Sequence, residues 1–77
     1  MKKELEINRM FAERLKSLRD ERNLSLRALA EELGVSYQAI NYYENLQRDP
    51  SIWVVKKIAD YFNVKIDWLI GNTDERT

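Results

Sequence analysis

The chain has 77 residues, of which 44% are hydrophobic, so it is long enough for one small domain with a modest core. It contains no Cys and no His, which excludes a disulfide framework and removes the usual zinc ligands and the commonest acid-base catalyst. Thirteen basic residues balance thirteen acidic ones, and no apolar run is long enough for a membrane span or a signal peptide. We therefore expect a cytoplasmic protein that is not an enzyme, with no metal, no cofactor, no small-molecule ligand and no membrane partner.

The first predicted element is a helix that starts at Asn8 or Arg9 and ends near Arg22. Residues 1–8 carry mixed charge, and we expect them to be a frayed N-terminal extension of this helix. Three apolar residues recur at the spacing of one helical face and are predicted to point inward: Phe11, Leu15 and Leu18.

Two short helices joined by a tight turn are predicted between Leu24 and Arg48. Ser25 stands where it can cap the first of them, and Gly34 ends it because glycine readily adopts the left-handed conformation. Ser36 follows two residues later and can cap the next helix. A cap, a glycine and a second cap within a dozen residues are typical of a helix-turn-helix.

The second helix of this unit has two different faces. Ala39, Ile40 and Tyr43 form an inward apolar stripe. A helix in the major groove reads bases near its N-terminus, so we predict that the residues of the opposite face contact bases: Tyr37, Gln38, Asn41 and Tyr42. The Gln38 amide can pair with adenine, and the helix has no Lys or Arg to bind guanine, which indicates an A·T-leaning half-site.

These segments and their order resemble the Cro/C1-type helix-turn-helix regulators of phages and bacteria. The family pattern runs roughly LSQEELAEKLGVS, TISRYENG, a Pro-led fourth helix and a closing DWLLG. The corresponding segments here are LSLRALAEELGVS, QAINYYEN, RDPSIWVVKKIADYFNV and DWLIG, and the resemblance covers about residues 9 to 72. It implies an all-α, compact five-helix, lambda-repressor-like DNA-binding domain over residues 9–71, with the helix-turn-helix at helices 2 and 3.

The resemblance also implies which residues hold the DNA backbone. Leu26 stands where the family commonly has a phosphate-binding Gln, so we expect Arg27 to take that role; an ordinary exposed Arg is the alternative. The segment from Ser25 to Asp49 is acidic by two charges, so we expect modest non-specific affinity. The other expected phosphate contacts are caps and loop residues: Ser25, Ser36, Asn45 and Arg48.

Arg19 matches the family residue that pairs with the Glu after the recognition helix, which is Glu44 here. We expect a structural ion pair, and if it is partly shielded, loss of one member leaves the other uncompensated and costs more than the roughly 0 to 1 kcal/mol of an exposed pair. After Glu44 the family usually has Asn-Gly, but here Asn45 is followed by Leu46, which resists a positive φ. Either Asn45 takes the left-handed position or the loop is built differently.

The fourth helix is expected to start at the segment Asp49-Pro50-Ser51, with Pro in its opening turn. Trp53 and Val54 fall outside its apolar stripe, and we predict that they form a contact surface, either for a second subunit or for the sugar-phosphate edge of DNA. Five residues make up the predicted buried stripe: Ile52, Val55, Ile58, Ala59 and Phe62.

A short fifth helix is predicted over residues 64–70, capped by Asp67 or the residue before it and ended by Gly71. Residues 72–77 are expected to be disordered.

From these features we expect a sequence-specific transcriptional regulator of double-stranded DNA that acts at the nucleoid. We expect a repressor that binds an inverted repeat as a homodimer, with half-sites about one helical turn apart. The alternative is a protein-interaction module, such as an antitoxin or a partner-binding regulator. It is motivated by Trp53, Val54, the zero net charge and the missing phosphate-binding Gln.

Overall fold

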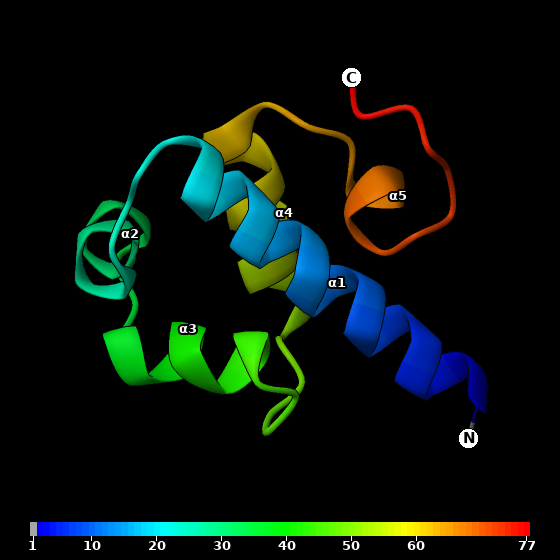
Figure 1. Cartoon of the computed structure of the whole chain (residues 1–77), viewed down its shortest axis with the longest axis horizontal. Helices are drawn as coiled ribbons and strands as arrows, with labels where there is room; N and C mark the ends of the chain where they lie inside the picture. The colour runs from blue at the N-terminus through cyan, green and yellow to red at the C-terminus, as the bar shows by residue number, and fades with distance from the viewer. Residues whose placement is uncertain (1) are drawn as a thin grey trace.

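The computed structural model describes residues 2–77, with side chains described from Leu5 onward. This part of the chain folds into five helices: α1 (Lys2–Glu21), α2 (Leu26–Leu33), α3 (Tyr37–Glu44), α4 (Ile52–Phe62) and α5 (Ile66–Leu69). Figure 1 shows α1 crossing the middle of the molecule, with α2 and α3 toward one end and α5 toward the other. The predicted all-α class with five helices is confirmed.

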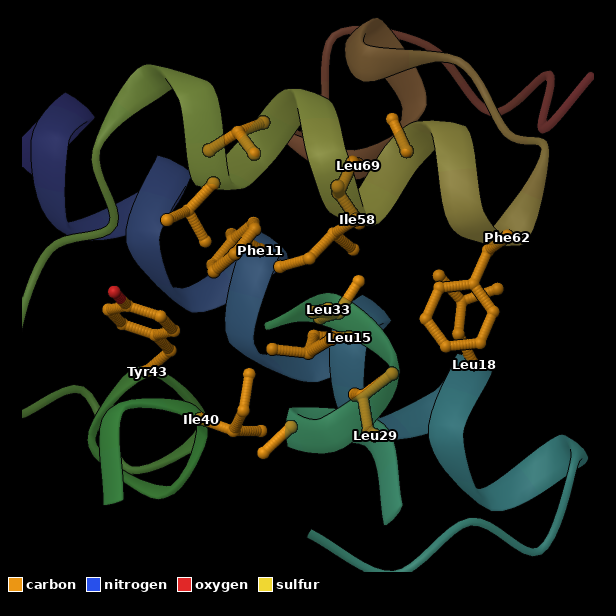
Figure 2. Close-up of a cluster of buried hydrophobic side chains, with 14 of the residues drawn as sticks. Phe11, Leu15, Leu18, Leu29, Leu33, Ile40, Tyr43, Ile58, Phe62 and Leu69 are labelled. Atoms are coloured by element: carbon orange, nitrogen blue, oxygen red, sulfur yellow. The ribbon is translucent and has the colours of Figure 1, made fainter. Parts of the chain in front are cut away.

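The core is formed by one apolar face of each helix, and no polar or charged residue among those described is buried. Figure 2 shows Ile40 and Tyr43 of α3 reaching toward Phe11 and Leu15 of α1. The rings of Phe11 and Tyr43 meet edge to face, with their centroids 6.2 Å apart. Apolar packing against α1 therefore sets the position of α3, and it leaves the opposite face of α3 outside the core.

The first helix is longer than the sequence pattern predicts. It starts at Lys2 rather than at Asn8 or Arg9, and residues 2–8 form its N-terminal extension. Residue 1 of the predicted extension lies outside the described residues.

Two predictions for α4 are wrong. Ile52, predicted to be buried, is 85% exposed, and Val54, predicted to be part of a contact surface, is 4% exposed. The helix begins at Ile52, and Val54 lies four residues before Ile58, so Val54 continues the buried stripe while Ile52 projects beyond it. Trp53 is exposed as predicted.

The loop after α3 is built around Leu46, which adopts a positive φ of 60°. Asn45 has a φ of −103°, so it does not take the left-handed position considered for it. The Asn45 side-chain amide donates instead to the backbone carbonyl and the side-chain oxygen of Asn41, at 2.8 Å and 2.9 Å. A leucine thus occupies the position for which the Cro/C1 pattern has glycine, at a cost of about 1 to 2 kcal/mol in local backbone strain.

Helix α5 is shorter than predicted, and its N-cap is Lys65, with Asp67 in the first turn rather than at the cap. Residues 72–77, which we expected to be disordered, pack against the domain in the structure. The backbone N–H of Lys65 donates to the carbonyl of Arg76 at 2.8 Å, which brings the last residues back to the start of α5.

Two arginines hold this C-terminal segment against the domain. Arg14 donates to the backbone carbonyls of Trp68 and Thr73, the latter at 3.0 Å, and Arg76 forms a two-point ion pair with Glu21. This pairing holds the pKa of Glu21 below its ordinary value, because the Arg76 guanidinium donates to the ionised carboxylate. Both guanidinium groups stack on the Trp68 ring, at 4.6 Å and 4.7 Å from its centroid. A tail of polar composition is therefore ordered by side chains that precede it in the sequence.

Leu46 is held at a positive φ, which glycine adopts more easily than any other residue. We expect the Leu46→Gly chain to be more stable than the Leu46→Ala chain by about 1 kcal/mol, because only glycine adopts this conformation without strain. Urea unfolding of both variants measures the difference. The same two substitutions at Gln47 are the control, and there we expect the Ala variant to be the more stable one. If the Ala variant is also more stable at position 46, the assigned loop conformation is contradicted.

Candidate nucleic-acid interface

Serine caps start both helices of the helix-turn-helix, as the sequence predicts. The Ser25 Oγ accepts a hydrogen bond from the N–H of Ala28 at 3.0 Å, and the Ser36 Oγ accepts one from the N–H of Ala39 at 3.1 Å. Each hydroxyl keeps its own hydrogen as a donor for an outside acceptor. The starts of α2 and α3 therefore combine free backbone N–H groups with a hydroxyl, which is an arrangement suited to phosphate oxygens.

The turn between α2 and α3 is held from two sides. Gly34 ends α2 in the left-handed conformation with φ 71°, and the N–H of Val35 bonds back to the carbonyl of Ala30 at 3.1 Å. Lys57 of α4 donates its Nζ to the carbonyl of Leu33 at 2.6 Å, which places a positive charge at the C-terminal end of α2. The role of Lys57 is not visible in the sequence pattern, because it depends on how α4 packs beside α2.

The outward face of α3 carries the four side chains predicted to contact bases, and none of them is buried. Tyr37 and Gln38 are exposed in the first turn, while Asn41 and Tyr42 are half-buried one turn later. The Asn41 side-chain oxygen accepts a hydrogen bond from Asn45, so its amide is already oriented. Gln38 is thus the more accessible of the two amides.

An arginine stacks on a tyrosine at each end of α3. The guanidinium of Arg27 lies 4.1 Å from the centroid of the Tyr37 ring, and that of Arg48 lies 4.8 Å from the centroid of Tyr42. A stacked guanidinium is held by its flat face and keeps its N–H donors at the edge free. The structure therefore places two positive groups at the ends of a helix that has no basic residue of its own.

The acidic end of α3 is neutralised by Arg19. Its Nε and Nη2 donate to the two carboxylate oxygens of Glu44 at 2.8 Å and 2.9 Å, and its Nη1 donates to the carbonyl of Leu24 at 2.8 Å. The two side chains are only 13% and 7% exposed. The hydrogen bonds with Glu44 raise the pKa of Arg19 above its ordinary value, so the guanidinium keeps its charge.

The other acidic residue beside this face, Asp49, is also engaged. Its carboxylate accepts a hydrogen bond from the side-chain amide of Asn8 at 2.9 Å. Two of the four acidic residues between Ser25 and Asp49 are therefore held by partners on α1, which lessens the negative charge that this unit presents outward.

The comparison with known proteins decides the family. The helix-turn-helix family model HTH_3 matches residues 15–69. The chain belongs to the Cro/C1-type helix-turn-helix family. It is 36% identical over 67 residues to the HTH-type transcriptional regulator SinR of Bacillus licheniformis, a match that covers 86% of this chain and 60% of SinR.

Two further relatives agree with this family. An uncharacterised HTH-type transcriptional regulator of Methanocaldococcus jannaschii is 44% identical over 63 residues, covering 80% of this chain and 96% of that protein. The crystal structure of an HTH_3 family transcriptional regulator from Vibrio cholerae superposes with a TM-score of 0.74 at 32% identity, covering 86% of this chain and 37% of that chain.

The chain spans about three fifths of the length of the first curated relatives that it matches. The relatives are named as regulators of transcription, so the family is one of DNA-binding regulators rather than of enzymes. Within residues 2–77 there is no helix whose length and hydropathy suit a membrane crossing.

The ion pair at the end of α3 gives a stability prediction. Glu44→Ala leaves Arg19 shielded from water without its partner, so we expect the free energy of unfolding to fall by about 2 to 3 kcal/mol. The matched control is Asp60→Ala, which breaks the exposed Lys56–Asp60 pair on α4 and is expected to cost less than about 1 kcal/mol. Denaturant unfolding of both variants measures the two losses. If both are equally small, the Arg19–Glu44 pair matters no more for stability than an exposed pair.

Proposed function

We propose that this chain is the DNA-reading domain of a transcriptional repressor that binds an inverted repeat as a homodimer. The observation that carries the proposal is the outer face of α3, which is polar, lacks charge along its first two turns and has a stacked arginine at each end. A face of this kind suits base edges in the middle and phosphates on both sides.

Gln38 is the central proposed base contact. It lies exposed in the first turn of α3, where a helix end enters the major groove, and its amide matches the donor and acceptor of adenine. Asn41 is the second amide on this face, with its oxygen oriented by Asn45. Tyr37 and Tyr42 have one ring face under an arginine, so their hydroxyls and ring edges are the parts proposed to meet the DNA.

The proposed phosphate contacts follow from the caps and the stacks. Ser25 and Ser36 offer hydroxyl donors beside helix N-termini, and Arg27 and Arg48 offer guanidinium edges. Asn45 is less suited to this role than the sequence implies, because both hydrogens of its amide are used on Asn41.

In this proposal, repression requires only that the protein stays bound at the promoter. A protein seated on a promoter at the nucleoid excludes the polymerase, and no bond is made or broken. With Arg27 and Arg48 from each of two copies, about four phosphates are neutralised, and log K is expected to fall with log salt at a slope of roughly −4. Pairing of two copies supplies the affinity that one domain of zero net charge lacks.

The alternative, a protein-interaction module, was motivated in part by an exposed surface at Trp53 and Val54, and only one of these residues is exposed. Val54 belongs to the core, so the contact surface suggested for Trp53 and Val54 is reduced to Trp53 alone. The Nζ of Lys57 lies 5.4 Å from the centroid of the Trp53 ring, which accounts for one face of that ring within the domain.

The proposal predicts the outcome of a selection from random double-stranded DNA. We expect the native chain to enrich an inverted repeat rich in A·T pairs, and a Gln38→Ala, Tyr42→Ala double variant to enrich none, because the proposed base contacts are removed. Ser17→Ala, an exposed neutral change on α1, is the control and should select the native sequence. No enrichment by the folded native chain at low salt would contradict the proposal.

A further inference from the structure

Asn45, the residue that follows α3, is bonded to Asn41 at two points. Its Nδ2 donates to the backbone carbonyl of Asn41 at 2.8 Å and to the Asn41 side-chain oxygen, Oδ1, at 2.9 Å. The backbone N–H of Asn45 donates to the same carbonyl at 3.1 Å. Both hydrogens of the Asn45 amide are therefore used on one residue, which holds the two side chains together at the C-terminal end of α3.

The loop after α3 keeps Asn45 in this position. Leu46 adopts a positive φ of 60°, and the N–H of Gln47 donates back to the carbonyl of Tyr42 at 2.8 Å. The chain therefore turns directly after Asn45, and Figure 1 shows it leaving the end of α3 through a tight bend before α4. Because the backbone N–H groups of residues 45–47 all donate to carbonyls of α3, the Asn45 side chain stays beside the last turn of the helix.

The bond from Asn45 decides which end of the Asn41 amide faces outward. The Oδ1 of Asn41 is held toward Asn45, so the Nδ2 at the other end of the amide points away with two hydrogens to donate. Among the described residues, none accepts a hydrogen bond from this Nδ2. Asn41 therefore meets a ligand as a hydrogen-bond donor, whereas the exposed Gln38 offers its donor and its acceptor together.

The four bases differ in what they present to a donor in the major groove. Guanine O6 and thymine O4 are keto oxygens that accept hydrogen bonds, whereas the amino groups of adenine and cytosine donate them. A fixed NH2 group therefore favours a keto base, because at an amino base two donors face each other. An amide that turns freely has no such preference, since it can also present its oxygen and pair bidentately with adenine.

We propose that Asn41 reads a keto base, guanine or thymine, and that Asn45 is the positioning residue that fixes this choice. The inference rests on the proposed function and deepens it by assigning a class of base to one position of the half-site. Gln38 and Asn41 are three residues apart on one helical face, which separates their Cβ atoms by about 5 to 6 Å. Successive base pairs lie about 3.4 Å apart, so the keto base lies one or two base pairs from the adenine proposed for Gln38.

The test compares four duplexes that differ only in the base pair proposed to meet Asn41. This position is found by repeating the selection from random DNA with Asn41→Ala, because its base preference disappears there while the position read by Gln38 keeps its own. We expect the native chain to bind the two duplexes with a keto base on the contacted strand about tenfold more tightly than the other two.

Asn41→Asp identifies the contacted strand and tests the direction of the hydrogen bond. The carboxylate has the shape of the amide and still accepts from Asn45, but it presents an acceptor where Asn41 presents a donor. We therefore expect this variant to favour the two duplexes that the native chain disfavours, which have an amino base on the contacted strand. The added negative charge lowers binding to all four duplexes, so only the ratios between them are compared.

Asn45→Ala tests the positioning role. Without the bond from Asn45 the Asn41 amide turns either way, so we expect the native preference to fall below about threefold. Gln47→Ala removes another exposed side chain of the same loop and is the matched control, which should keep the native ratios. The position read by Gln38 should keep its preference in both variants, whereas a general loss of structure would weaken it as well. Circular dichroism checks that both variants fold.

The outcomes separate this inference from the proposed function. If the native chain selects no sequence, the proposed function fails and the inference fails with it. If the native chain selects a sequence but Asn41→Ala changes no position of it, or Asn41→Asp favours the same base pairs as the native chain, only the inference is overturned. Unchanged ratios in a folded Asn45→Ala chain overturn the positioning role. If that variant does not fold, the Asn41→Asp comparison still decides which class of base Asn41 reads.

Discussion

The ion pair between Arg19 and Glu44 is the interaction on which the proposed DNA-binding face depends most. It joins the end of α1 to the end of α3 by two short hydrogen bonds, and a third bond from Arg19 holds the chain at Leu24, just before α2 begins. One guanidinium thus connects three segments that pack around the helix-turn-helix. The same pair removes a negative charge from the end of α3, where a free carboxylate would repel phosphate.

The zero net charge of the chain is compatible with DNA binding, because many of its charged side chains are paired within the domain. Arg14 and Arg76 are occupied with Trp68 and the C-terminal segment, and Arg19 is occupied with Glu44. Arg27 and Arg48 are different, because each lies over the ring of a tyrosine on α3, and a guanidinium held in this way can still donate from its edge. Net charge is a poor guide to this domain, since position decides which charges face a ligand.

Much of the fold could be predicted from the sequence because its signals are local. The serine caps, the glycine after α2 and the apolar spacing of α1 and α3 depend on residues within a few positions of each other. The family resemblance added the Arg19–Glu44 pairing, which no local pattern contains.

What the sequence could not predict depends on tertiary placement. Ile52 and Val54 both fit a helical stripe with Val55, Ile58 and Phe62, and only the exact start of α4 against α1 decides which is buried. The ordered tail depends on Arg14, some sixty residues earlier in the chain. The apolar groove lined by Ile7, Ile52 and Ile66 likewise arises where α1, α4 and α5 meet.

The most direct test of the account is to map backbone amide shifts by NMR while the native chain is titrated with its selected duplex. We expect the largest shifts at the starts of α2 and α3, along Tyr37 to Tyr42, and at Arg48. Shifts that leave α3 unchanged, or that gather only around Trp53, would contradict the assignment of α3 as the DNA-reading helix.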